Sequence, residues 1–526
     1  MHCLNICFDL LAFTLIFKTS HVAAVFGVGT GILFDPPDSA NLRTTGISSD
    51  LYFEQRIDHF NPTDSRTYQQ RYHLTENYYN ESSTNHVFLM LGGEWEATSR
   101  WLTYGTWIET AKHYGALLMY LEHRYYGQSQ PFSDLSTENM QYLSSHQALA
   151  DAAAFIEGMN DQYNLTDANW IVFGASYAGT LAAWLRHKYP HLVAGAMSSS
   201  APLNAILDFN EYLEVVANGL GTHSQTCIDN VKEAYDQLEE LVTGCLEDED
   251  AYNELDEMFK LCDSIQASEG NDKDLTTLFQ ILTDSIFAHV VQYHRRPSAT
   301  ISINTICEIM VNDTAGATKL KRLAEVNALL LENAGSNCRD FKYANLVAGW
   351  SNTTIVASSM MRQWVYQTCT EFGFFQTSTQ DNPIFGTRFN ITYFTDLCID
   401  LFGEEFNETL SSIGIQTTNT RYGAANIATS KIVYFHGSID PWHVLGKLST
   451  TDDVGDKVII VEGVAHCANM IDADESDPEE LNVARAEIRN LIGQWLGVVD
   501  ASGGNSVQNG YILQVLILML VIKSFI

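Results

Sequence analysis

Basic side chains are scarce in this chain, and their scarcity limits the functions it can have. Its 526 residues include 29 Lys and Arg against 64 Asp and Glu, for a formal net charge of −35 at pH 7. Such a charge repels phosphates, which argues against nucleic acid as a partner. The acidity fits an ordinary soluble protein, and it equally fits a protein of an acidic compartment, where partial protonation relieves the repulsion.

Other absences narrow the class of protein further. The sequence has no C-x-x-C pair, no internal repeat and no long low-complexity linker. We therefore expect no metal site and no cofactor. Hydrophobic residues make up 46% and charged residues 18%, which is typical of a globular chain. The length favours a large domain with an insertion, or two domains.

The amino terminus resembles a secretory signal. An apolar block at 10–17 is followed by small residues at 22–24, although the segment before it has only His2 in place of Lys or Arg. Removal of residues 1–24 leaves eight of the ten cysteines, an even number that predicts disulfides. Which cysteines pair, and whether Cys467 is paired or free, stays open. Glycosylation sequons, which fit the same pathway, begin at Asn80, Asn164, Asn312, Asn352, Asn390 and Asn407. The sequence thus predicts an extracellular, cell-surface or lysosomal protein.

The carboxyl terminus raises a separate membrane question. Small residues at 501–506 lead through a polar stretch to a hydrophobic tail at 511–526. This order predicts a lipid-anchor signal whose tail is removed. A helix packed on the core and a tail-anchored membrane span are the alternatives.

Short apolar runs alternate with helical segments in the first part of the chain. Runs at 85–91, 115–121, 171–173 and 193–200 have the length of buried strands, which predicts a parallel sheet covered on both faces. Strand character returns at 431–437 and 457–463, before an amphipathic closing helix at 481–496. We therefore assign an α/β domain to 45–203 and 346–500.

The segment between these two parts has a different hydrophobic pattern. Residues 204–345 show helical periodicity and contain five of the cysteines. We expect an inserted helical cap domain stapled by disulfides.

The run 168–185 has the layout of a nucleophile elbow. An apolar strand leads into a turn that carries Ser176, and a helix of small residues follows. Gly174 and Ala178 occupy the places where strand and helix must approach closely. Ala178 stands where the strict pattern has glycine, and Gly179 comes one residue late.

A serine nucleophile needs a base and a group that orients the base, and in this layout they follow in the order acid, histidine. Asp440 follows the strand at 431–437, and His466 follows the strand at 457–463. His436 and His443 precede the last strand, which favours pocket or structural roles for them. The sequence therefore predicts Ser176, Asp440 and His466 as a catalytic triad.

The oxyanion of the reaction also needs donors. The backbone N–H of Tyr177 is the first candidate, and the glycine-rich loop after the strand at 85–91 offers that of Gly93. The neighbouring carboxylate of Glu94 either binds a substrate amine or caps a turn.

Several motifs together resemble one family. They lie at 55–60 (Gln-Arg-Ile-Asp-His-Phe), 122–129 (Glu-His-Arg-Tyr-Tyr-Gly-Gln-Ser), 147–151, 174–179, 367–376 and 440–443. They resemble the secreted serine peptidases that include prolylcarboxypeptidase, dipeptidyl peptidase II and thymus-specific serine protease, with the thymus-specific branch most similar. The resemblance implies an α/β-hydrolase fold with a helical cap after the sixth strand, and the three triad roles given above.

The resemblance also implies a substrate. It suggests cleavage near proline, by removal of one residue from a carboxyl terminus or two from an amino terminus, in lysosomes, endosomes or outside the cell and often by a dimer. Peptides are then the partners, and the cap is expected to block one side of the cleft. The candidate pocket residues are Glu94, Trp364, Trp442 and His443, with Tyr125, Tyr126, Met361, Arg362 and Gln363 as further wall candidates.

Two other functions stay open on the sequence alone. One is a catalytically silent binding protein on the same fold. The other is a lipase or esterase, for which we expect a purely apolar pocket without a charge to hold a peptide terminus.

Overall fold

The computed structural model describes residue 36 and residues 47–80, 85–245, 249–268, 271–294, 299–313, 316–450 and 455–498. The predicted signal at 1–24 and the predicted anchor signal at 501–526 lie outside them, as does the side chain of Cys245. Within the described residues, every helix is too short or too polar to cross a membrane.

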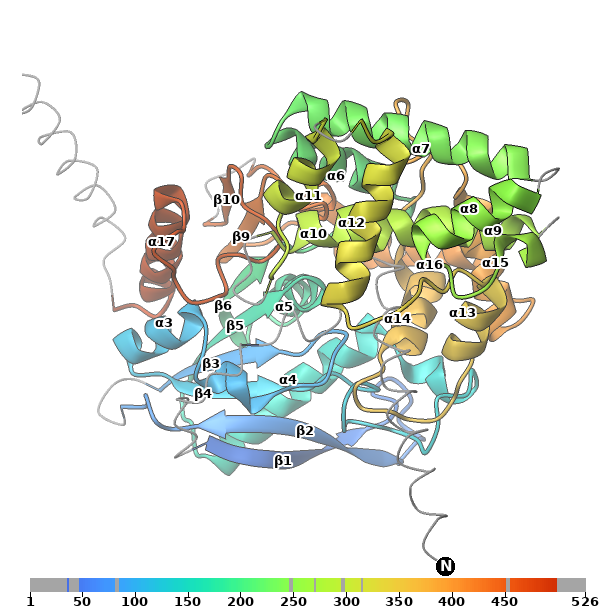
Figure 1. Cartoon of the computed structure of the whole chain (residues 1–526). Coiled ribbons are helices and arrows are strands. Elements are labelled where there is room, and N and C mark those ends of the chain that lie inside the picture. Colours follow the sequence, from blue (N-terminus) through green and yellow to red (C-terminus); the bar gives the residue numbers. More distant parts are fainter. Residues whose placement is uncertain are drawn as a thin grey trace, which may run out of the picture.

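A mostly parallel eight-stranded sheet forms the centre of the molecule (Figure 1). The strand order is β1-β2-β4-β3-β5-β6-β9-β10, and β2 runs antiparallel to both neighbours. In the central strands β4, β3, β5, β6 and β9 nearly every residue is buried, as a sheet covered on both faces requires. The strands are β1 (Ile47–Arg56), β2 (Thr67–Thr75), β3 (His86–Leu91), β4 (Leu117–Leu121), β5 (Asn169–Ala175), β6 (Val193–Ser199), β9 (Ile432–Gly437) and β10 (Lys457–Val461).

Helices cover the two faces of this sheet. Helix α17 (Glu479–Trp495) packs on β6 and β10 and contacts α3 (Thr106–Tyr114). On the other face α5 (Tyr177–Lys188) packs on β3, β5 and β6 and contacts α4 (Ser145–Gln162) (Figure 1). The α/β-hydrolase fold expected from the sequence is thereby confirmed, with the closing helix at its expected place.

A layer of helices lies between β6 and β9 in the sequence and above the sheet in Figure 1. We call the helices from α6 to α13 the cap. The cap consists of α6 (Glu211–Gly221), α7 (Gln225–Cys245), α8 (Glu249–Phe259), η4 (Ile265–Ser268), α9 (Asp272–Leu282), η5 (Thr283–Ala288), α10 (His289–Gln292), α11 (Ile303–Val311), α12 (Lys319–Asn333) and α13 (Tyr343–Trp350).

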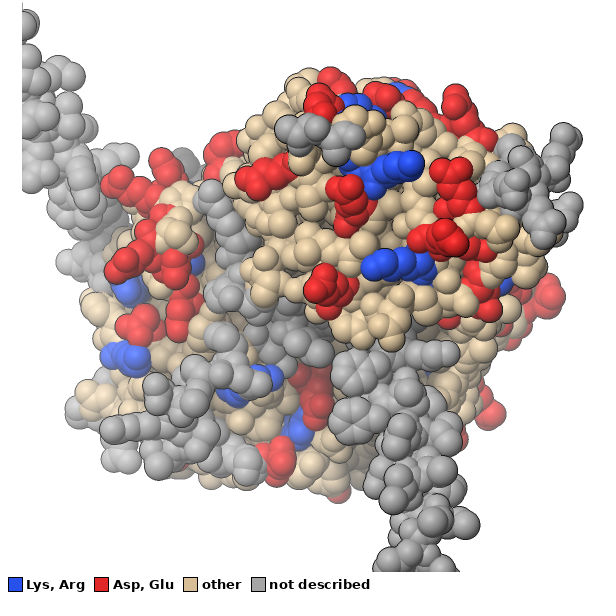
Figure 2. Space-filling model, in the orientation of Figure 1, with Lys and Arg blue, Asp and Glu red and all other residues tan. Residues whose placement is uncertain are grey.

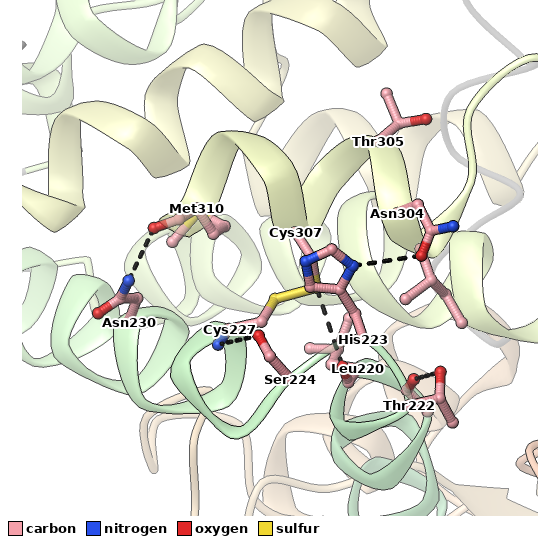
Figure 3. Close-up of a disulfide and its surroundings, with 12 residues drawn as sticks. Leu220, Thr222, His223, Ser224, Cys227, Asn230, Asn304, Thr305, Cys307 and Met310 are labelled. Carbon is pink, nitrogen blue, oxygen red and sulfur yellow. Dashed lines mark hydrogen bonds between the residues drawn. A yellow bond between two sulfur atoms is a disulfide. The ribbon is translucent and has the colours of Figure 1, made fainter. Parts of the chain in front are cut away.

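Disulfides staple the cap, as predicted. Cys227 of α7 is bonded to Cys307 of α11, and next to this bond the Asn230 amide donates to the carbonyl of Met310 at 2.9 Å (Figure 3). A second bond joins Cys262 to Cys338. Closing loops of this length stabilises a fold by restricting its unfolded chain.

The return segment leads from the cap back to the sheet. A third disulfide, Cys369–Cys398, lies within it. Its elements are α14 (Met361–Gln367), η6 (Thr368–Phe372), β8 (Gly373–Phe375), α15 (Ile391–Phe402), α16 (Glu408–Tyr422) and η7 (Ala424–Asn426), and β8 pairs with β7 (Ile206–Asp208) in a separate two-stranded sheet.

The first motifs of the chain form a buried ionic network at the edge of the sheet. Arg124 binds Asp151 with two hydrogen bonds of 2.6 and 2.7 Å, and His59 and Tyr68 bind the same carboxylate at 2.7 and 2.9 Å. Nearby, Arg71 of β2 binds Glu122. These contacts therefore join the loop after β1, strand β2 and helix α4 to the loop after β4.

The surface is strongly acidic. Figure 2 shows Asp and Glu side chains spread over the cap and over α17, with few Lys and Arg between them. Five of the six predicted glycosylation asparagines are exposed, and Asn407 is half-buried at the start of α16. Glycosylation of these sites stays a prediction.

Strand β5 and helix α5 cross at two close contacts. A Cβ on Gly174 would overlap the backbone carbonyl of Ala178, and a Cβ on Gly179 would lie 2.7 Å from the carbonyl oxygen of Ser199. Gly179, one residue late for the strict motif, is thus the second small residue that the turn requires, because it faces β6.

Replacing Gly174 with Ala is expected to destabilise the fold by roughly 2–3 kcal/mol, because the added methyl group has no space between β5 and α5. Urea unfolding followed by tryptophan fluorescence measures the change. Gly349→Ala is the matched control: it lies in α13 with open space around it, so its stability stays equal or rises slightly. Equal stability of the two variants would contradict the close crossing.

Candidate active site

Ser176 lies at the turn between β5 and α5, where the backbone is held in an unusual conformation. Its φ is 58° and its ψ is −131°, a left-handed region that side chains other than glycine rarely adopt. The Ser176 N–H donates to the carbonyl of Ser199 on β6 at 2.9 Å, and its carbonyl accepts from Thr180 at 3.0 Å. These bonds fix the residue at the carboxyl edge of the sheet, with its side chain partly exposed.

Asp440 and His466 meet at the same edge. Both are buried, and Nδ1 of His466 lies 2.8 Å from Oδ1 of Asp440. The backbone N–H of Trp442 donates to the same carboxylate oxygen at 3.0 Å. Because Nδ1 is bound to Asp440, Nε2 is the imidazole nitrogen that would take a proton from a hydroxyl group in base catalysis.

The two loops that carry this pair are bound to each other. Gly437 at the end of β9 has no space for a Cβ against the carbonyl of Val464. Oγ of Ser438 accepts from Gly463 N–H at 2.9 Å, and the N–H of Ile439 donates to Val464 at 3.2 Å. Because β9 and β10 are parallel neighbours, their carboxyl ends bring acid and histidine together.

Left-handed residues also occur next to the predicted triad. Besides Ser176, Ser200 has φ of 51° and Cys467 has φ of 58°, and the Cys467 N–H donates to Oγ of Ser200 at 2.8 Å. Each such residue costs of order 1–3 kcal/mol and persists only where surrounding contacts enforce it. Three of the described left-handed residues therefore lie in the loops that follow β5, β6 and β10.

Burial and the attraction between the two side chains have opposite effects on the pKa values of His466 and Asp440. Burial of His466 lowers its pKa, but the charge and hydrogen bond of Asp440 outweigh it and raise the pKa above the ordinary 6.5. Burial likewise acts to raise the pKa of Asp440, and His466 reverses this and lowers it. The carboxylate thus stabilises a protonated imidazole, as an intermediate in acyl transfer requires.

A small cavity joins these residues to the cap. Ser176 and His466 line it together, which shows that nucleophile candidate and base candidate face one space. Five of the other lining residues are aromatic. The full lining is Glu94, Trp95, Ser176, Tyr177, Pro202, Gln292, Tyr293, Trp364, Trp442 and His466.

The cap residue Gln292 contacts both triad loops. Its backbone carbonyl accepts from the N–H of His466 at 3.1 Å. Its side-chain oxygen accepts from Trp442 Nε1 at 3.2 Å and from the Tyr212 hydroxyl at 2.6 Å. The neighbouring Tyr293 places its ring edge-on to His466, with centroids 6.2 Å apart.

Sequence reasoning missed both of these cap residues. The segment around them reads as a buried helix end, and no motif marks Gln292 or Tyr293 as neighbours of a histidine so far along the chain. Only the folded arrangement of α10 over the loop after β10 brings them together.

The candidate oxyanion donors lie beside the nucleophile. Tyr177 begins α5, and its hydroxyl accepts from Gln367 Nε2 at 3.0 Å and lies 3.1 Å from His123 Nε2. Gly93 lies against Ala178, where an added Cβ would be 3.4 Å from that residue's backbone nitrogen. Both backbones are therefore at the start of α5, where N–H groups collect.

Other predicted pocket residues lie elsewhere. His443 is not among the lining residues, because its Nδ1 turns back to the carbonyl of Asp440 at 2.7 Å and closes the turn after β9. Tyr125, Tyr126 and Arg362 are also absent from the lining; their side chains bind Asn139, Gln367 and backbone carbonyls instead.

The structure answers whether Cys467, which the sequence leaves open, is paired. Cys467 is a free, fully buried thiol next to His466. Its Sγ lies 4.0 Å from the carbonyl of Ser199, inside the packed floor of the site. In the described part of the chain, six of the eight cysteines form bridges.

Comparison with known proteins gives a family model and individual relatives that agree with each other. The family described as serine carboxypeptidase S28 matches residues 55–488. A Caenorhabditis elegans protein named as a serine protease, K12H4.7, is 36% identical over 84% of this chain and 87% of its own length. Thymus-specific serine protease of Mus musculus is 32% identical over 86% and 88%. Lysosomal Pro-X carboxypeptidase of Homo sapiens is 26% identical over 86% and 89%.

Replacing Asp440 with Asn is expected to lower the pKa of His466, because burial remains while the carboxylate that most strongly opposes it is lost. Titration of the imidazole signals by NMR in histidine-labelled protein measures the shift. Asp472→Asn, which removes an exposed carboxylate bound to Gly105 N–H, is the control and leaves the pKa of His466 unchanged. An unchanged pKa in Asp440→Asn would contradict the pairing.

Proposed function

Because the chain belongs to the serine carboxypeptidase S28 family, and is therefore a serine peptidase, we propose that it cleaves short pieces from the ends of peptides, next to proline, with Ser176 as nucleophile. The observation that carries the proposal is the 2.8 Å bond between His466 and Asp440 at a cavity that Ser176 also lines.

In the proposed reaction, Oγ of Ser176 attacks the carbonyl carbon of the scissile bond while Nε2 of His466 takes the hydroxyl proton. The imidazolium then gives this proton to the leaving amine, and an acyl-enzyme remains. Asp440 stabilises the imidazolium and does not itself take the proton. Water attacks the acyl-enzyme by the same route and releases the acid.

The oxyanion is held by backbone N–H groups of Tyr177 and Gly93. Such donors are effective because they are fixed before the reaction and lie in a site from which water is largely excluded. The hydrogen bonds of the Tyr177 hydroxyl to the return segment and to His123 support this role by holding the residue in place.

Two features support attack near a chain end and near proline. Gln292 and Tyr293 of the cap line the cavity, so the cap closes one side of it. The rings of Trp364 and Trp442 offer apolar walls of the kind that suit a pyrrolidine ring. One relative is named as a Pro-X carboxypeptidase, which agrees with the proline preference proposed for this chain.

The proposed site of action is the secretory pathway or the lysosome. Three disulfides in the described residues fit an oxidising compartment. The signal, the glycans, the lipid anchor and the homodimer are part of the same proposal.

The decisive variant is Ser176→Ala. With proline-containing peptides and mass-spectrometric detection of products, we expect kcat/KM to fall by about 10⁴-fold or more, because the acyl-enzyme cannot form. Ser449→Ala, at an exposed serine, is the control and keeps full activity. Cleavage by Ser176→Ala at the rate of the control would contradict the proposed function.

A further inference from the structure

One charged group in the cavity has no role in the triad chemistry. The carboxylate of Glu94, in the loop after β3, is only 5% exposed, and its Oε2 accepts no hydrogen bond from any described residue. A buried carboxylate oxygen normally has a partner, since leaving it unpaired costs free energy. Glu94 lines the space that Ser176 and His466 face, so a bound substrate is the partner available to it.

The walls around this carboxylate suit a cation. Trp95, Tyr177, Tyr293, Trp364 and Trp442 surround the cavity. Aromatic faces attract ammonium groups through their π electrons, and the attraction grows when water is excluded. Among the described lining residues there is no Lys or Arg to neutralise the carboxylate, and protonated His466, which lines the same cavity, is paired with Asp440.

We propose that this cavity binds a positively charged nitrogen of the peptide substrate, with Glu94 as its counter-ion inside the aromatic box. The inference rests on the proposed peptidase function and adds a charge requirement to it. Two sources carry this chemistry: the ammonium group at the amino terminus of the peptide, and the side chain of a Lys or Arg residue.

Two further observations support this assignment. Burial raises the pKa of Glu94 to about 7, only partly offset by its own backbone N–H and by His466, as expected for an acid that lacks a cationic partner. A docked ammonium group would return it to the charged form. The net charge of −35 also draws cationic peptides toward the protein from a distance.

The alternative reading of Glu94 is a structural cap of its own loop. In that case its removal would affect folding and every substrate alike. A cation site instead predicts that the effect depends on the charge of the substrate, so matched peptides separate the two.

The experiment uses purified full-length protein and sets of peptides that share one sequence. The first pair has a free or an acetylated amino terminus. The second pair has an acetylated terminus and differs by lysine against norleucine, and the third pair has a free or an amidated carboxyl terminus. Each is measured with wild type, Glu94→Gln and Glu96→Gln, the last of which neutralises a partly exposed carboxylate two residues away that binds Arg71.

Wild type and Glu96→Gln are expected to prefer the charged member of the first or second pair by about 10- to 100-fold in kcat/KM, mostly through KM. In Glu94→Gln the preference falls to less than about threefold, while the uncharged member is cleaved at nearly the wild-type rate. A preference in the first pair identifies the terminal ammonium group; one in the second pair identifies the side chain.

Other results overturn the inference. These are equal cleavage of both members by wild type, a charge preference that survives in Glu94→Gln, or a preference only in the third pair. Loss of activity toward every peptide in Glu94→Gln, with an unchanged unfolding curve, would also contradict it. All of these differ from failure of the proposed function, in which Ser176→Ala still cleaves.

Discussion

The close crossing of β5 and α5 is the constraint on which the rest of the site depends. There is no space for a side chain at Gly174 or Gly179. Because both residues are glycine, the chain can reverse from strand to helix within one residue. That residue is Ser176, forced to a left-handed backbone and anchored to β6 through Ser199. A wider turn would lower the strain but would withdraw the hydroxyl from the edge where Asp440 and His466 arrive.

The remaining parts of the site are brought together by the parallel sheet and closed by the cap. Parallel strands end at one edge, so loops far apart in sequence meet above β5, β6, β9 and β10. Gln292 then binds both triad loops from the cap side, through its backbone to His466 and through its side chain to Trp442. The cap is thus hydrogen-bonded to the loops that carry Asp440 and His466 in addition to covering them.

Much of this could be predicted from the sequence because the relevant signals are local. Continuous apolar runs mark strands that are buried on both faces, and the runs at 85–91 and 431–437 became β3 and β9. The order of serine, acid and histidine along the chain follows from strand ends. The border between the sheet domain and the cap is also visible in the sequence, because short apolar runs are replaced there by helical periodicity.

The parts that could not be predicted arise from contacts between distant segments. Strands β1 and β2 bury polar residues such as Gln55, Gln70 and Arg71, which pair with one another and with Glu122, so no hydrophobic pattern reveals them. His443 follows Asp440 too closely in a tight turn to reach the cavity. Gln292 comes near His466 only through the packing of the cap.

The central claim is that Ser176 is an activated nucleophile at the described cavity. Its most direct test is reaction of the purified protein with a fluorophosphonate, followed by digestion and mass-spectrometric mapping of the adduct. The account predicts stoichiometric labelling of Ser176, which ceases when the protein is unfolded beforehand. An adduct on another serine, or a folded protein that is not labelled, would contradict it.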